Sequence, residues 1–247
     1  MRLTAIALGL IVLFTPPAIA QEGKKLSAGA VQAAKEFKSY IDQTTAAKAK
    51  PNLTTPPAAP LFAKIFDTKV LATLPPATAA DLSWESEWLG VSANSYMAVI
   101  NFGTNPQAPD YQQALEDNVQ RYEDEISLAM EFMLRLMPRM VTSARSFMQT
   151  LSEAERNSPT RQKGLSDIRS GYMQTVSGAT SFVAGGPKLP NAKLVARALR
   201  DTVDDWRVLA SAEERAQLVN VVNQARENVK DADAEESLAI ILSALNK

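Results

Sequence analysis

Apolar residues recur at intervals of three and four along most of the chain, which is the spacing of the buried face of an α-helix. The pattern is strongest from residue 61 onward, where apolar stripes are separated by breaks rich in Pro, Gly and Asn. No segment alternates apolar and polar residues as a half-buried strand does. The sequence therefore predicts an all-α fold, a multi-helix bundle of about six to seven helices in one domain.

Capping residues locate the helix ends. Asp110 with Gln113 and Ser211 with Glu214 have the spacing of capping boxes, and Pro159 suits the first position of a helix. Short loops between the later helices indicate antiparallel neighbours. The helices expected from these signals run over 81–100, 110–155, 159–185, 191–209, 211–229 and 233–245.

The first twenty residues have the pattern of a secretory signal peptide. Arg2 precedes an apolar run over 5–14, and Ala18-Ile19-Ala20 forms a small-x-small cleavage site before Gln21. The run is too short to span a bilayer, and no later segment is long and apolar enough to do so. We therefore expect cleavage after Ala20, no transmembrane span after that cleavage, and a periplasmic or secreted product.

Residues 21–60 differ in composition from the rest. A weakly amphipathic helix is expected over about 26–47, followed by a proline-rich linker over 51–60. We interpret this segment as a solvated basic arm attached to a domain over 61–247 that folds alone, and the alternative is an arm that touches anionic lipid or wall polymer. The six lysines that make it basic are Lys24, Lys25, Lys35, Lys38, Lys48 and Lys50.

The long helix expected over 110–155 carries a heptad-like apolar seam and a cluster of methionines around Pro138. Proline is expected to kink the helix, and methionine fills the irregular gaps that a kink leaves. Thioethers also bind Cu(I), and methionine-rich surfaces accept varied partners, so a copper site and a plastic groove remain alternatives. The methionines are Met130, Met133, Met137 and Met140.

Glycines recur every seven residues along the next helix, at 164, 171, 178 and 185. This period keeps them on one side, where a neighbouring helix can pack closely or a ligand groove can form. Counting from a loop near Asn157, we expect Gly178 opposite Pro138. The candidate groove therefore combines the four methionines with Gly171 and Gly178, and we expect leucine to be more damaging at either glycine than at Gly23.

Composition removes most catalytic chemistry. The 247 residues include no cysteine and no histidine, so no disulfide, Cys/His zinc site, Ser-His-Asp triad or Cys-His dyad can form. The 26 basic and 27 acidic residues give a formal net charge of −1, which offers no electrostatic basis for binding nucleic acid. No phosphate loop, dinucleotide fingerprint or calcium loop occurs, so we expect no cofactor.

One short segment, Trp84-Glu85-Ser86-Glu87-Trp88, resembles the start of the motif of lytic transglycosylases, in which the glutamate is the general acid. The resemblance covers about four residues and implies peptidoglycan cleavage by Glu85. The Gly-Leu-Met-Gln segment of that family does not follow Ser92; Gly171-Tyr172-Met173-Gln174 lies far downstream. Without catalysis, Glu85 is expected to be solvated while the two tryptophans face the core.

The interpretation that the sequence favours is an exported, non-catalytic helical protein that binds a protein partner or an apolar ligand in the cell envelope. Copper binding through the methionines is the first alternative, and peptidoglycan cleavage by Glu85 is a distant one. No catalytic residue set is assigned.

Overall fold

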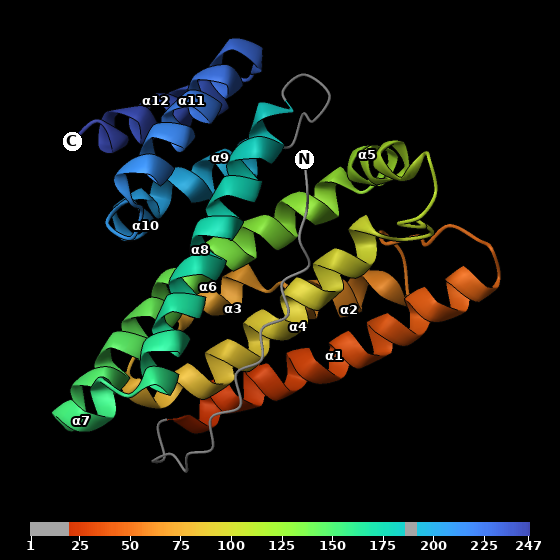
Figure 1. Ribbon diagram of the computed structural model, residues 1–247. Coiled ribbons are helices and arrows are strands. Elements are labelled where there is room, and N and C mark those ends of the chain that lie inside the picture. Colours follow the sequence, from red (N-terminus) through yellow and green to blue (C-terminus); the bar gives the residue numbers. More distant parts are fainter. Residues whose placement is uncertain (1–19, 186–191) are drawn as a thin grey trace.

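The computed structural model describes residues 20–185 and 192–247, and within these ranges it is helical with no strand (Figure 1). The predicted all-α fold is confirmed. The expected signal peptide, apart from Ala20, and the expected cap Asn191 lie outside the described residues. Among the helices described, none combines the length and the apolar character needed to cross a membrane. In chain order the elements are α1 (Ala20–Ala46), α2 (Ala58–Ile65), α3 (Thr68–Thr73), the 3₁₀ helix η1 (Ala79–Asp81), α4 (Leu82–Ile100), α5 (Tyr111–Arg121), α6 (Glu123–Gln149), α7 (Glu153–Arg156), α8 (Pro159–Ala184), α9 (Ala192–Asp201), α10 (Val203–Arg207), α11 (Ala212–Asn228) and α12 (Ala232–Leu245).

The N-terminal half is built around α4, which packs between α1 and α6, while α2 covers α1. Aromatic side chains connect these helices. Phe37 of α1 meets Phe62 of α2 with ring centroids 5.7 Å apart, and Trp88 of α4 meets Phe132 of α6 at 5.1 Å. Such contacts add specific geometry to the burial of large apolar surfaces. They fix α1, α2, α4 and α6 as one core.

Helix α1 belongs to that core, which contradicts the expectation of a solvated arm. Phe37 is fully buried, and Ala30, Ala33 and Ile41 are buried with it. These four positions form a narrow stripe that steps by three or four residues along one side of α1. The lysines of α1 are exposed and lie on its other faces. The basic composition of the segment therefore did not predict that one face of α1 is buried.

The long helix expected over 110–155 is divided in the structure. Helix α5 ends at Arg121, and α6 begins at Glu123 with three carboxylates in its first turn, where the helix dipole favours negative charge. Tyr122 between them is buried and donates its hydroxyl to the carbonyl of Pro51 at 3.2 Å. Helix α6 then continues through Pro138 as a single element.

The C-terminal half gathers α9, α11 and α12 at one end of the molecule, and α6 and α8 connect it to the other half (Figure 1). The expected capping box of Ser211 and Glu214 is present, and Pro159 opens α8. The box expected from Asp110 and Gln113 does not form, because the side chain of Asp110 makes no cap hydrogen bond.

Candidate functional site

The four methionines of the predicted groove are sealed inside the protein. Their exposed fractions are 6% for Met130 and Met133, 2% for Met137 and 1% for Met140. Neither surface pocket described below includes any of them. The seam of α6 therefore packs as core, where methionine adapts to irregular neighbours.

Helices α6 and α8 pack together as the sequence predicts, but one heptad out of the expected register. A Cβ atom on Gly171 would lie 3.9 Å from Cε of Met137, so Gly171 faces the methionine seam. The expectation of Gly178 opposite Pro138 is wrong. Helix α7 and its flanking turns fill the connection, which shifts its midpoint from Asn157 toward residue 154, about equally distant from Met137 and Gly171.

The glycines of α8 do not form a tightly packed flank. A Cβ atom on Gly164 or Gly178 would meet nothing within 4 Å, whereas one on Gly23 of α1 would lie 2.4 Å from Cε2 of Trp84. An added side chain therefore has less room at Gly23 than at Gly178, contrary to the expectation for that pair, whereas Gly171 is buried beside Met137. The backbone of α1 closely approaches the side chain of Trp84 where α1 packs on α4, and no periodic pattern in the sequence predicts this contact.

The serines beside these glycines do line a surface groove. The groove runs between α8 and α11, encloses about 330 Å³, and has Met173, Leu218 and Val221 as its apolar residues. Ser170 and Ser177, seven residues apart, give α8 a low wall at two points. The polar residues that complete the lining are Gln174, Glu214 and Gln217.

One end of this groove is held by charged contacts. Arg169 of α8 pairs with Glu214 of α11 and donates from Nε to the carbonyl of Leu209 at 2.9 Å. Glu214 also accepts from the backbone nitrogen of Ser211 at 2.7 Å, closing the capping box. The hydrogen bond from the N–H of Ser211, more than the nearby charge of Arg169, lowers the pKa of the Glu214 carboxyl. The groove is therefore preformed at this end.

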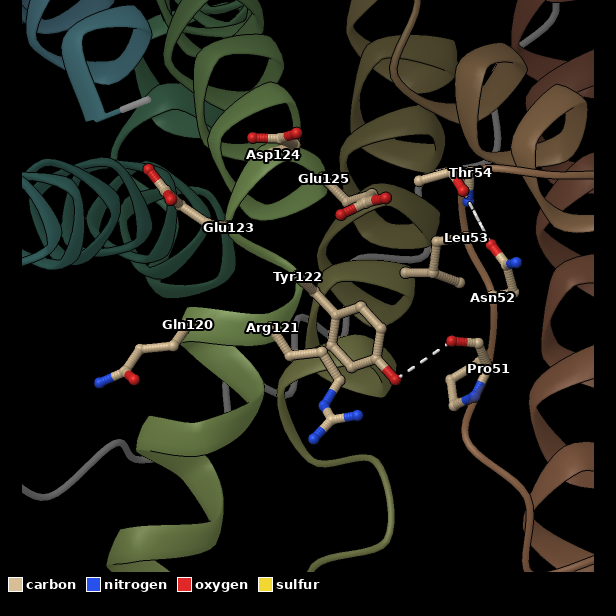
Figure 2. A pocket seen from close by; sticks show the side chains of 10 residues that line it. All are labelled: Pro51, Asn52, Leu53, Thr54, Gln120, Arg121, Tyr122, Glu123, Asp124 and Glu125. Atoms are coloured by element: carbon tan, nitrogen blue, oxygen red, sulfur yellow. Dashed lines mark hydrogen bonds between the residues drawn. The ribbon is translucent and has the colours of Figure 1, made fainter. Parts of the chain in front are cut away.

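A second pocket, of about 440 Å³, lies where α5 meets α6 (Figure 2). Its two sides are the loop over 51–54 and the junction over 120–125. Two tyrosine hydroxyls form hydrogen bonds with this loop. Tyr122 donates to the carbonyl of Pro51, and Tyr40 accepts from the backbone nitrogen of Asn52 at 2.8 Å. The pocket is thus a fixed feature of the fold.

Three carboxylates lie at this junction, and two of them, Glu123 and Glu125, are each 8% exposed. Figure 2 shows the carboxylate of Glu125 on the side that faces Leu53 and Thr54, whereas Glu123 and Asp124 project away from that loop. Burial raises the pKa of the Glu125 carboxyl, its own backbone N–H lowers it, and Asp124 raises it further.

Glu85 is fully buried between α4 and α6, so the expectation of a solvated side chain is wrong. Its Oε1 lies 3.3 Å from Nε of Arg139, whose Nη1 donates to the carbonyl of Pro75 at 2.7 Å. Burial raises the pKa of Glu85 to about 7, while Ser143 and Arg139 lower it by less. The Glu85 side chain has no exposed surface, and Glu85 lines neither of the two pockets described above.

Sequence reasoning found one wall of the groove and missed the rest. The heptad period of glycines indicates the α8 wall, but no pattern in the sequence pairs α8 with α11. The second pocket joins residues seventy positions apart, and only the tyrosine at the junction could have indicated it. A comparison with known proteins finds no matching family model, no similar curated protein and no similar solved structure.

Proposed function

We propose that this chain is an exported, non-catalytic protein of the cell envelope that binds a protein partner, and that the partner places an amphipathic helix in the groove between α8 and α11. The observation that carries the proposal is the groove itself, in which apolar residues of α8 and α11 lie between the two helices. A third helix can bury an apolar stripe there by ridges-into-grooves packing.

The wall of α8 suits a helix better than a free apolar molecule. Ser170 and Ser177 lie two turns apart, and small side chains at that spacing let another helix approach closely. A free apolar ligand is the alternative occupant, but the groove is bordered by Gln174, Gln217 and Glu214, which suit the polar flanks of an amphipathic helix. The partner is therefore expected to present apolar residues at helical spacing between polar ones.

Site-specific photocrosslinking in intact cells tests the proposal. A benzophenone amino acid replaces Gln174 in the groove or Gln162 near the start of α8, both of them exposed glutamines on one helix. We expect one crosslinked envelope protein from position 174 and none from position 162. Equal crosslinking from both positions, or crosslinking from neither, would contradict the proposal.

Export has its own test, because it rests on the signal-peptide pattern alone. Intact-mass measurement of the periplasmic or secreted protein is expected to give a chain that begins at Gln21. A mature mass that retains residues 1–20 would contradict this part of the proposal without bearing on the groove.

A further inference from the structure

The pocket at the α5–α6 junction holds a buried carboxylate that the fold does not neutralise. Glu125 is more than nine-tenths buried and faces the pocket, and the described chain places no lysine or arginine within ion-pair distance of it. A buried charge without an oppositely charged partner is costly, so its presence beside a cavity points to a cationic ligand.

We propose that this pocket binds a small primary alkylammonium ion, with the carboxylate of Glu125 as its anionic partner. A metal ion fits less well, because the described residues contain no group of three or more acidic, His or Cys side chains placed to hold one. A calcium ion takes about six to eight oxygen ligands, and the cavity of about 440 Å³ is larger than an ion alone requires.

The uncharged lining suits the alkyl part of such a ligand. The ring of Tyr122 and the side chain of Leu53 form apolar surface beside Glu125 (Figure 2). An aromatic face also attracts a cation. The carbonyl of Pro51 accepts one hydrogen bond, from Tyr122, and has a second lone pair for an N–H donor.

The other charged groups at the pocket define where a cation can sit. Figure 2 shows the guanidinium of Arg121 beyond the ring of Tyr122, on the side away from Glu125. A second cationic group at that end would be repelled, so a monoammonium ion is favoured over a diammonium ion. Glu123 and Asp124 add negative potential but project away from the loop over 51–54.

The helix dipole explains only part of this arrangement. Acidic residues in the first turn of α6 stabilise its N-terminus, which accounts for carboxylates at the exposed position 124. It does not require that the carboxylate at position 125 be buried beside a cavity. Burial raises the pKa of Glu125, and a bound cation would favour the ionised carboxylate, so binding should strengthen as pH rises above the ordinary carboxyl pKa of 4.5.

Calorimetric titration of the full chain with n-butylammonium chloride tests this inference. We expect saturable binding that falls about tenfold or more in Glu125→Gln and is unchanged in Glu116→Gln, which alters an exposed carboxylate of α5 outside the pocket. n-Butanol, which has a similar alkyl chain without charge, should bind at least tenfold more weakly.

A measurement on the unaltered protein covers the case in which Glu125→Gln folds poorly. In amide NMR spectra, butylammonium should shift the resonances of residues 51–54 and 120–125 more than any others. The inference is overturned by absence of binding, by equal binding of butanol, or by amide shifts centred elsewhere. None of these results bears on the groove between α8 and α11.

Discussion

Oε1 of Glu85 lies 3.3 Å from Nε of Arg139, and this pair joins α4 to α6 from inside the core. The Glu85 side chain is 0% exposed and that of Arg139 is 16% exposed. Neither oxygen of Glu85 nor Nε of Arg139 makes a hydrogen bond of good geometry. Removing a carboxylate from water is only partly offset by such a contact, so the neutral form of Glu85 is favoured.

The first prediction follows from this raised pKa. The Glu85 carboxyl titrates near 4.5 when exposed and at about 7 in the fold, so the folded state binds the proton more tightly. The stability that Glu85 contributes is complete below about pH 4.5 and is lost as pH rises to about 7. Relative to Glu85→Gln, the wild-type free energy of unfolding should therefore fall across this window.

Urea unfolding of both proteins at several pH values measures this difference. Glu87→Gln, which removes an exposed carboxylate two residues away, is the control for general loss of charge. If the free energies of unfolding of the wild type and of Glu85→Gln change in parallel from pH 4.5 to 7, Glu85 is already ionised in the fold and the prediction is wrong.

The second prediction concerns the contact of α1 with α4. Gly23→Ala should destabilise the protein by about 1–3 kcal/mol, because the added Cβ would lie 2.4 Å from Cε2 of Trp84. Gly178→Ala should be neutral or stabilising by up to about 1 kcal/mol, since its Cβ meets nothing within 4 Å and alanine favours helix. Chemical denaturation ranks the two variants, and the opposite order would refute the packing of α1 on Trp84.

The third prediction tests whether α1 is part of the core. Phe37 is fully buried against Phe62, so Phe37→Ala should cost about 3–5 kcal/mol in the free energy of unfolding. Lys35→Ala, on an exposed face of the same helix, should change it by less than about 0.5 kcal/mol. A chain limited to 61–247 should lose cooperative thermal unfolding, and a full cooperative transition in that chain would contradict the structure.

The fourth prediction separates packing from copper binding in the methionine seam. Met133→Leu and Met137→Leu each conserve volume in a sealed site, so each should cost less than about 1.5 kcal/mol. Adding Cu(I) under reducing conditions should leave the melting temperature of the wild type unchanged. A Cu(I)-dependent rise in melting temperature that both variants abolish would instead establish a thioether site.

Local signals predicted much of the fold, and long-range contacts account for what they missed. The capping box at Ser211 and the proline that opens α8 act within a few residues, and the structure confirms both. The break at Tyr122 depends on a hydrogen bond to Pro51, and the burial of Glu85 depends on Arg139 in another helix. No helical period encodes such partners, so the sequence predicted one unbroken helix and a solvated carboxylate.

At the candidate site too, the sequence predicted local features but not the contacts between helices. The heptad period of small residues in α8 correctly indicated an unusual face, but the structure uses its serines to line a groove with α11, while Gly171 faces the methionine seam. The length of the connection through α7 determines which residues of α8 pack against α6. The connection is longer than the sequence predicts, because Ser152 and Glu155 form a capping box for a short separate helix.

Blocking the groove tests the proposed function most directly. A benzophenone amino acid at position 217, on the α11 wall, reports the partner while tryptophan replaces either Ser177 in the groove or Ser166, an exposed serine of α8 outside it. Both variants should keep the wild-type melting temperature. We predict that the crosslink to the envelope partner is lost in Ser177→Trp and retained in Ser166→Trp; equal crosslinking in the two variants would show that the groove between α8 and α11 is not the binding site.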